Sequence, residues 1–452
     1  MYKLKFIIEQ SNEDLTPHSG MALVGALLNK TSLKLRFDKT KIRGIPTPRI
    51  TNGEIATAYI GLLCQGKSDF DNIEPFREDN FFALALNLKD IPSSPTLRQR
   101  FDMGAPNQLW NEIIREESAK LIKNSTTPLT PLYLGTSGNQ RRYLPLDIDV
   151  SPFDNSKTKK EGVSRTYKGY DGFAPIFSYL AREGYAINTE LRQGKDHCQN
   201  GTVEFLKKSI GYAKCISSTP LLVRMDSGND SADNIRVCLD EETKADFIIK
   251  RNMRREKAET WLIIAQQQGP GCIEREGKTV YMGSVMWKPK GFTIPVRLVY
   301  KVVERTILAN GQVLLFPDIE VETYWTSLPD PADIIINLYH DHGTSEQFHS
   351  ELKTDLDLER LPSGKFATNN LVLHFGIFAY NILRIIGQMT MKLDKSMVPL
   401  RKKAQRRRVR TVIQNLITIA CRMVCHARQV KLRFGRHSPW LNTFKHIYAL
   451  LI

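Results

Sequence analysis

The sequence predicts an α/β protein in which a central sheet is interrupted by a β-rich insertion and flanked by helical N- and C-terminal regions. Three observations lead to this fold class. Strand-like patterns alternate with helical ones over residues 141–250, as in a mixed sheet with crossover helices. A stretch of mainly strand-like patterns follows over residues 251–332, and helical periodicity then resumes. The chain has 452 residues, 41% of them hydrophobic, so we expect two to four domains with buried cores.

The N-terminal region, residues 1–140, is predicted to be mainly helical. The segment from Thr51 to Glu54 fits a capping box at the start of a helix. Another helix is expected to begin at Ser94, with proline in the first helical position. This second helix carries side chains suited to phosphates and base edges, although an ordinary surface helix would look the same; they are Thr96, Arg98 and Arg100.

The first part of the core, residues 141–250, begins with a strand. Apolar side chains from Leu144 to Val150 alternate with Asp147 and Asp149, which predicts one buried face and one acidic face. The following elements are predicted to be a hairpin over 173–180 and 185–192, a helix over 201–213, a strand over 221–225, a second helix, and a strand over 245–250. This β-β-β-α-β-α-β order is typical of an RNase H-like sheet.

The insertion, residues 251–332, and the elements after it complete the predicted order. The insertion should be antiparallel, with strands over 279–286, 293–303, 312–316 and 320–325. The second part of the core, residues 333–394, should contain helices over 333–352 and 368–391. The C-terminal region, residues 395–452, is predicted to be helical and is strongly basic.

The composition indicates a polyanionic partner. Lys and Arg outnumber Asp and Glu by 64 to 48, for a net charge of +16, which favours nucleic acid or an anionic membrane surface. The longest apolar stretch, Leu371 to Gly387, contains His374, Asn381 and Arg384, so we expect a buried helix and no membrane span. We also expect no signal peptide.

The seven cysteines are scattered, with no Cys-x-x-Cys pair, which favours a reducing cytoplasm and argues against structural zinc. Cys421 and Cys425 would lie one helical turn apart beside His426, but core packing explains them better than a metal site.

Three carboxylates have the placement that phosphodiester chemistry requires. Asp149 and Asp226 end two predicted strands, and Glu346 lies on the helix after the insertion. Oxygen ligands of this kind bind Mg²⁺, and a pair of such ions can activate an attacking oxygen and stabilise a leaving one. The alternative is that each is an ordinary strand-end or solvated carboxylate.

The predicted helix around Glu346 favours the first interpretation. Tyr339, His342, Glu346 and Lys353 are spaced by 3, 4 and 7 residues, which places them along one helical face. A tyrosine, a potential cation, a carboxylate and a lysine in one stripe suit a DNA phosphate better than a core or a solvated face. Of the two aspartates on the first strand, Asp149 lies nearer the end where Asp226 is expected. We therefore predict Asp149 as the metal ligand, with Asp147 as the alternative or as a carboxylate behind the ligands.

These residues resemble a known family. The spacing Tyr339-x2-His342-x3-Glu346-x6-Lys353 resembles the Y-x2-R-x3-E-x6-K signature of DDE insertion-sequence transposases. Other landmarks occur in the order typical of the DDE group 1 branch, the insertion-sequence family numbered 1380: Ser94-x-Thr96-Leu97-x2-Arg100, Leu146–Ser151, Leu191-Arg192-x-Gly194, Arg224-x-Asp226-Ser227-Gly228, Leu361-Pro362, Phe366, Asn369 and Ala379-Tyr380-Asn381.

The resemblance implies a fold, an activity and a set of partners. It implies an RNase H-like catalytic core with an insertion between the second and third acidic residues, and cut-and-paste transposition that uses Mg²⁺, with Mn²⁺ as a substitute. Asp149, Asp226 and Glu346 would hold the metal, and Tyr339, His342, Lys353 and Arg192 would bind phosphates. The partners would be double-stranded DNA, both terminal inverted repeats and target, and a second protomer in the DNA complex. The location would be the bacterial cytoplasm, at the nucleoid.

One departure from the signature and three further alternatives remain. His342 replaces an arginine, and imidazole is mostly neutral near pH 7 where guanidinium is always charged. Glu346-x-x-His349 has the spacing of one half of a di-iron site, but no second copy occurs. The chain could instead be a stand-alone Mg²⁺-dependent nuclease. It could also be a non-catalytic DNA-binding protein derived from a transposase.

The basic tail and the tryptophans of the insertion are further candidates for DNA contact. Seven cations within ten residues could bind a DNA backbone, although a solvated face or a membrane-surface helix has the same charge pattern; they are Arg401, Lys402, Lys403, Arg406, Arg407, Arg408 and Arg410. One of Trp261, Trp287 and Trp325 could stack on a flipped base, but packing within the sheet is the simpler interpretation.

Overall fold

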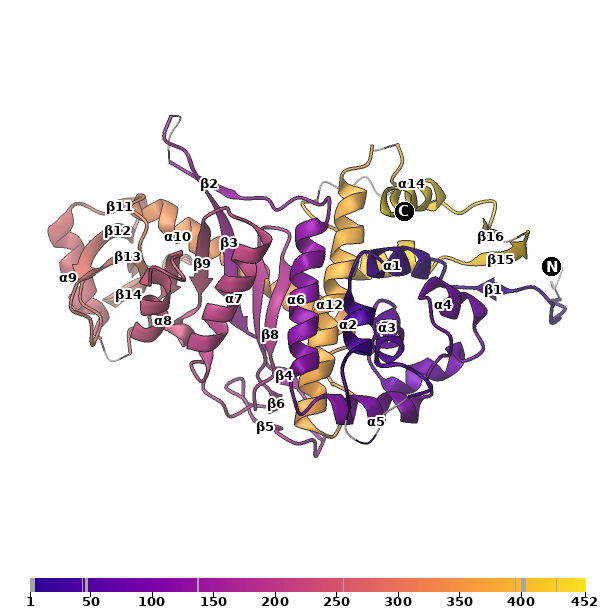
Figure 1. Cartoon of the computed structure of the whole chain (residues 1–452). Coiled ribbons are helices and arrows are strands. Elements are labelled where there is room, and N and C mark those ends of the chain that lie inside the picture. The colour runs from indigo at the N-terminus through magenta and orange to yellow at the C-terminus, as the bar shows by residue number, and fades with distance from the viewer. Residues whose placement is uncertain are drawn as a thin grey trace. The chain divides into compact units, whose positions relative to one another are not determined.

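The computed structural model describes residues 5–42, 44, 48–135, 138–254, 256–394, 396–399, 404–427 and 429–452. The chain divides into two compact units (Figure 1). One is Ile114–Asn381, and the other combines Met1–Ile113 with Ile382–Ile452. The division falls within the helices α6 (Leu109–Asn124) and α12 (Phe366–Met391).

The first unit is built on a mixed sheet with the predicted order of elements. Strands β3, β7 and β8 are antiparallel neighbours, and β9 and β10 continue the sheet parallel to β3, giving the spatial order β8-β7-β3-β9-β10. Helices α7 and α8 connect the parallel strands. The bounds are β3 Arg141–Val150, β7 Ile176–Leu180, β8 Tyr185–Glu190, α7 Thr202–Ile216, β9 Leu221–Met225, α8 Ala232–Leu239 and β10 Asp246–Lys250. This is the RNase H-like arrangement, so the predicted α/β fold class is confirmed.

The insertion extends the same sheet. Its strand β14 pairs antiparallel with β10, and β13, β12 and β11 follow outward. The bounds are α9 Ala258–Gln268, β11 Cys272–Arg275, β12 Lys278–Trp287, β13 Val296–Ile307 and β14 Val313–Thr326. The two strands predicted over 312–325 form one long strand. Pro317 does not interrupt it, because β14 has a neighbouring strand on one side only at this point, and such a position tolerates the missing backbone N–H of proline. Helix α9 was not predicted.

Short strands border the start of the core. β2 (Leu132–Leu134) pairs with β3, and β4 (Phe153–Asp154), β5 (Ser164–Arg165) and β6 (Asp171–Phe173) form a small sheet. The predicted strand over 173–180 is therefore divided, since β6 ends at Phe173 and β7 begins at Ile176, with Pro175 between them.

The helical segment after the insertion is not one continuous α-helix. Helix α10 (Ala332–His340) continues into a 3-10 turn (Asp341–Thr344), α11 (Ser345–Ser350) and a π-helical turn (Glu351–Asp355). The predicted helix over 333–352 thus changes its winding twice. Gly343, which weakens an α-helix, lies in the first of these changes.

Helix α12 matches the predicted buried helix. Among the described residues it alone is long and apolar enough, by length and composition, to cross a membrane. Its apolar window is 94% buried inside the protein, so packing accounts for its apolar character.

The second unit is mainly helical at its N-terminal end, as predicted. Its helices are α1 Met21–Leu28, α2 Leu33–Asp38, α3 Asn52–Leu63, α4 Asn80–Ala85 and α5 Ser94–Gly104, with a 3-10 helix over Phe70–Phe76. The capping box at α3 is confirmed: the Thr51 side chain accepts from the Glu54 amide, and the Thr51 amide donates to the Glu54 carboxylate. At α5 the capping residue is Ser93, because the Ser94 hydroxyl bonds Asp71 instead.

The C-terminal tail contradicts its predicted all-helical character. Short helix α13 (Val409–Val412) and helix α14 (Leu441–Leu451) flank a hairpin of β15 (Cys421–His426) and β16 (Gln429–Phe434). β15 pairs with β1 (Leu15–Thr16) at the opposite end of the sequence. Such a remote partner cannot be read from local periodicity. Cys421 and Cys425, expected one helical turn apart, lie four residues apart along a strand. Cys421 is buried while Cys425 and His426 are exposed, so packing in the core explains Cys421 but not Cys425.

Candidate active site

Two of the three predicted acidic residues end neighbouring parallel strands. Asp149 lies at the end of β3, and Asp226 follows the last residue of β9. Because β3 and β9 are parallel, these ends meet at one edge of the sheet. Both side chains line an open cavity of about 850 Å³, and Glu346, exposed on α11, lines the same cavity. The fold therefore brings the predicted triad to one cavity.

The two aspartates differ in their ionisation. Burial and the negative charge of Asp149 raise the pKa of Asp226. A hydrogen bond of 2.7 Å from Asn229 Nδ2 lowers it, but by less. Burial would also raise the pKa of Asp149, but that pKa is lowered, because the hydrogen bond and charge of His349, the charge of His342 and the Val150 amide together outweigh burial. Two carboxylates that repel each other in a partly buried site are the arrangement that a divalent cation relieves.

The donor set fits a hard divalent cation. All three predicted ligands offer carboxylate oxygens, the donors that Mg²⁺ and Mn²⁺ prefer. In the part of the chain that the structure describes, no group of three His, Cys, Asp or Glu side chains is close enough to hold a metal ion as the side chains stand. The two aspartates converge, whereas Glu346 is exposed on the cavity wall.

Asp147 has a different environment from Asp149. Its carboxylate accepts two hydrogen bonds from Arg224, from Nε at 2.6 Å and from Nη2 at 2.8 Å. A third nitrogen of Arg224, Nη1, donates to the carbonyl of Leu338 at 2.7 Å. Both charged side chains are buried, and Asp147 does not line the cavity. Its position is that of a carboxylate behind the ligands.

His342, which stands where the family signature has arginine, is a buried side chain of the cavity wall. Its Nδ1 lies 3.1 Å from Asp147 Oδ1, but neither ring nitrogen has a hydrogen-bond partner in suitable geometry among the described residues. Burial alone would lower the pKa of His342. The carboxylates of Asp147 and Asp149 outweigh burial, and the pKa is raised. The site thus favours a charged imidazole where the signature has a guanidinium.

His349 has a role that the sequence did not reveal. Its Nε2 lies 3.1 Å from Asp149 Oδ2, and its Nδ1 lies 3.1 Å from the Tyr179 hydroxyl on β7. Ser345 Oγ adds a hydrogen bond of 3.3 Å to the same Asp149 oxygen. The histidine of Glu346-x-x-His349 thus contacts Asp149 in this structure. The only sequence signal was the spacing of three residues from Glu346.

The remaining members of the predicted stripe line the cavity despite the changes in helix winding. Lys353 Nζ donates to the carbonyl of Pro152 at 2.6 Å, and burial lowers its pKa. Tyr339 packs against Tyr324 and His342, with ring centroids 4.8 and 5.8 Å apart. Tyr339, His342, Glu346 and Lys353 all belong to the cavity wall.

Other predicted phosphate and base contacts are placed elsewhere. Arg192 is buried and bonds Glu190, the Cys198 carbonyl and the Thr202 hydroxyl. It does not line the cavity, so its predicted phosphate role has no support.

On α5, Arg100 is buried and donates to Asn52 Oδ1 at 2.6 Å. Thr96 and Arg98 are half-buried, and Arg98 lies 3.4 Å from Asp71. Of the three residues predicted to read element ends, Arg100 is therefore placed as a structural residue.

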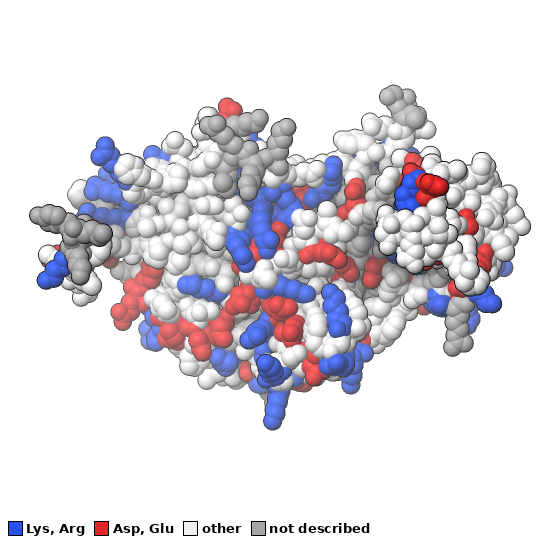
Figure 2. All heavy atoms as spheres, turned by 180° about the vertical axis from the view of Figure 1, so that it is seen from behind, with Lys and Arg blue, Asp and Glu red and all other residues white. Residues whose placement is uncertain are grey.

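The predicted basic cluster is only partly described. Arg401, Lys402 and Lys403 lie outside the described residues. Arg406 and Arg407 are half-buried, and Arg408 and Arg410 are exposed. Arg407 Nε donates to Thr390 Oγ1 at 2.9 Å, and its guanidinium lies over Trp440. On the face shown in Figure 2, basic and acidic side chains are interspersed, without one continuous basic patch.

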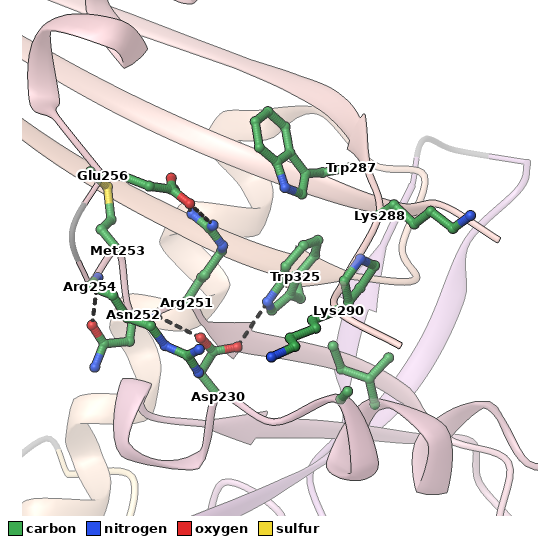
Figure 3. A pocket seen from close by; sticks show the side chains of 13 residues that line it. Asp230, Arg251, Asn252, Met253, Arg254, Glu256, Trp287, Lys288, Lys290 and Trp325 are labelled. Atoms are coloured by element: carbon green, nitrogen blue, oxygen red, sulfur yellow. Dashed lines mark hydrogen bonds and ion pairs between the residues drawn. The ribbon is translucent and has the colours of Figure 1, made fainter. Parts of the chain in front are cut away.

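A second cleft lies beside the insertion (Figure 3). It has a volume of about 620 Å³, and Arg251, Lys288, Lys290 and two tryptophans are among its lining residues. Trp325 is buried and its Nε1 donates to Asp230 at 3.0 Å, whereas Trp287 is 38% exposed. The third tryptophan, Trp261 on α9, is buried. Trp287 is thus the tryptophan of the three that faces an open surface.

Comparison with known proteins gives one family and several solved structures. Residues 5–452 match the family model described as "Transposase DDE domain group 1". No curated protein matches. The chain is similar to piggyBac transposase in a cryo-EM structure of its synaptic complex with hairpin DNA, at 12% identity and a TM-score of 0.42, covering 90% of this chain and 82% of that one.

Proposed function

The chain belongs to the transposase DDE domain group 1 family, and we propose that it binds the ends of its own DNA element and moves that element by metal-dependent strand cleavage and strand transfer. One observation carries this proposal. Asp149 and Asp226 end adjacent parallel strands and share a cavity with Glu346. A phosphodiester reaction centre needs such a convergence of carboxylates at an accessible surface.

Asp149, Asp226 and Glu346 would hold Mg²⁺, with Mn²⁺ as a substitute. When bound, the metal would activate the attacking oxygen, either water or a DNA 3′-hydroxyl, and stabilise the leaving oxygen. The residues around the ligands prepare the site for it. His349 fixes the orientation of the Asp149 carboxylate, and Asn229 does the same for Asp226.

His342, Lys353 and Tyr339 would contact the phosphates of the bound element end. The three line the cavity that contains the acidic residues. The raised pKa of His342 favours the charged form that a phosphate would attract. Lys353 is held beside the end of β3 by the Pro152 carbonyl. These contacts would position the scissile phosphate, which is the main role of protein groups in phosphoryl transfer.

The DNA would extend beyond this cavity. Arg406, Arg407, Arg408 and Arg410, together with Arg401, Lys402 and Lys403, would contact the backbone, and Trp287 would offer its exposed ring to a base. Thr96 and Arg98 on α5 would contribute to the recognition of element ends. The partners would be terminal inverted repeats, target DNA and a second protomer.

The order of sequence landmarks supports the branch numbered 1380 among insertion sequences. A cytoplasmic location at the bacterial nucleoid follows from that assignment.

A strand-transfer assay tests the proposal. The full chain would be incubated with labelled duplexes that carry the ends of its element, a target plasmid, and Mg²⁺ or Mn²⁺. We expect cleavage at the element end and covalent joining to the target. Cleavage without joining would indicate a stand-alone nuclease. Binding without cleavage in either metal would indicate a non-catalytic DNA-binding protein.

The backbone contacts can be tested separately. Replacing Arg406, Arg407 and Arg408 with glutamine should weaken binding to element-end and random duplexes about equally, and should flatten the log–log salt dependence by roughly two to three units. A loss confined to element-end duplexes, with an unchanged slope, would contradict the assignment to the backbone.

A further inference from the structure

An open apolar groove lies within the second unit, whereas the three predicted acidic ligands belong to the first. It has a volume of about 650 Å³ and is lined by side chains from α1, α4, β16 and α14. Leu84 of α4, Val430 of β16 and Tyr448 of α14 are 38–52% exposed in it. A contiguous apolar surface of this kind, formed by four elements, is typical of an interaction site.

Strand β16 gives the groove an unpaired edge. The sheet order is β1-β15-β16, so β16 pairs with β15 on one side and with no other described strand. Alternate residues of β16, Val430, Leu432 and Phe434, all line the groove. An edge strand beside an apolar groove is the arrangement that binds an extended segment, because the backbone pairs with the edge and every second side chain enters the groove.

The same chain presents a segment with matching properties. Residues 5–12, here called the N-terminal arm, belong to no helix or strand. Its residues Phe6, Ile7 and Ile8 are 80%, 82% and 96% exposed. The arm is attached at its base to β15, where the Asp14 carbonyl accepts from the Met423 amide at 2.8 Å. That attachment lies on the β1 side of the sheet, and β16 is the opposite edge.

One carboxylate of the arm complements the lysines of the groove, whereas Lys5, at the other end of the apolar run, does not. Lys30 and Lys445 line the groove, and no acidic side chain lines it in the described part of the chain. In the arm, Glu9 follows directly after the apolar run from Phe6 to Ile8. An extended arm would place Phe6 and Ile8 on the same face, with the carboxylate of Glu9 within the reach of a lysine at the rim.

We propose that the N-terminal arm of a second copy of this chain docks as an added strand on β16, with its apolar side chains in the groove. The exchange is reciprocal, so two copies form a closed dimer with two equivalent arm–groove contacts. This dimer forms without DNA, and it does not depend on the catalytic proposal. It would provide the paired protomers that synapsis of two element ends requires.

Complementation between two variants of the full chain tests the exchange. Ile8→Glu disables the arm, and Val430→Glu disables the groove. In sedimentation or light scattering at micromolar concentration without DNA, we expect the wild type to be dimeric and each variant to be at least tenfold weaker in self-association. An equimolar mixture of the two variants should regain dimers, because one arm and one groove remain intact in each mixed pair.

A matched control replaces an equally exposed apolar residue elsewhere. Leu315→Glu, on the long strand β14 of the insertion, should leave the dimer unchanged, since Leu315 is 89% exposed but belongs to the other unit and does not line the groove. Three outcomes would overturn the proposal. The first is a monomeric wild type whose arm amides are protected from hydrogen exchange, which would indicate docking within one chain. The second is a dimer that survives Ile8→Glu. The third is a dimer that Leu315→Glu disrupts while Ile8→Glu does not.

Discussion

Two regions of strand β3 show how neighbouring carboxylates acquire opposite roles. Asp147 and Asp149 are two residues apart and therefore lie on the same face of the strand. Asp147 is buried and accepts two hydrogen bonds from Arg224. Asp149 faces the open cavity beside Asp226 and accepts from His349. One carboxylate has a fixed internal cation, and the other lies beside a second carboxylate.

The register of the sheet explains the difference. Asp147 lies opposite Arg224 of β9, and the ladder between the two strands ends one residue later, at Ile148 and Met225. Asp149 therefore extends past the last paired residue of β9, where Asp226 begins the following turn. A residue inside the ladder is enclosed by its neighbours, and a residue beyond it reaches the cavity. The depth of a side chain along the strand decides its role.

The largest expected effect is the loss of cleavage activity when Asp149 is replaced. Asp149→Ala should abolish element-end cleavage, by at least roughly a thousandfold, because loss of a metal ligand removes several kcal/mol of transition-state stabilisation. Binding to element ends should remain close to that of the wild type, since affinity comes mostly from basic side chains. Cleavage in Mg²⁺ and binding in chelator would be measured on one preparation. Near-normal cleavage by this variant would assign the metal to another residue.

The second prediction concerns stability. Arg224→Met leaves the Asp147 carboxylate buried without its cation and should lower the free energy of unfolding by about 3–5 kcal/mol. Adding Asp147→Leu should restore most of this loss, because neither member of the buried pair then remains. Arg49→Met is the control: it removes an exposed pair with Asp90 and should change stability by about 0–1 kcal/mol. Denaturant unfolding measures all three. Similar losses of unfolding free energy for Arg224→Met and Arg49→Met would show that the buried pair contributes no more to stability than the exposed one.

The third prediction uses metal preference. Asp149→Cys should lose activity in Mg²⁺ and regain part of it in Mn²⁺, which accepts a thiolate more readily. Asp147→Cys should show no such change of metal and should instead be less stable. Cleavage rates in each metal, with folding checked by circular dichroism, distinguish the two. Manganese rescue at Asp147 and none at Asp149 would reverse the roles of the two regions.

The sequence predicted the core well because its signals are local. Alternation around Leu146 and the run from Leu221 to Met225 placed β3 and β9, and strand ends are where carboxylates can converge. The prediction that Tyr339, His342, Glu346 and Lys353 share one surface also agrees with the cavity wall, although the helix changes its winding between them.

Long-range contacts account for what could not be predicted. β15 pairs with β1 across about the whole length of the sequence, so the tail was mistaken for helix. Arg192 and Arg100 resemble DNA contacts in sequence, but exposure is a property of the fold and both are buried. His349 meets an oxygen of Asp149 some 200 residues away, and no spacing rule reveals such a pair.

The smallest expected effect is on the free energy of unfolding without metal. Substitutions at Asp226, beside Asp149, and at Asp147 should change this free energy in opposite directions. Asp226→Asn should stabilise the metal-free protein at pH 7 by on the order of 1 kcal/mol, and Asp147→Asn should destabilise it. Thermal unfolding in chelator measures both.

The sign follows from the pKa shifts. Burial and Asp149 raise the pKa of Asp226, so above its ordinary value near 4 the folded state holds more protons than the unfolded state, and stability falls as pH rises. Burial opposes ionisation of Asp147 too, but Arg224 and His342 outweigh it and lower that pKa, so its contribution is present at neutral pH and is lost on acidification. The gain from Asp226→Asn should therefore shrink between pH 7 and pH 4, whereas the loss from Asp147→Asn should shrink only below about pH 4, where Asp147 of the wild type becomes protonated. Added Mg²⁺ should raise the melting temperature of the wild type, through binding to the folded state alone, and should raise that of Asp226→Asn less. Equal destabilisation by both substitutions, with no dependence on Mg²⁺, would show that Asp226 is an ordinary structural carboxylate and that the contrast with Asp147 does not hold.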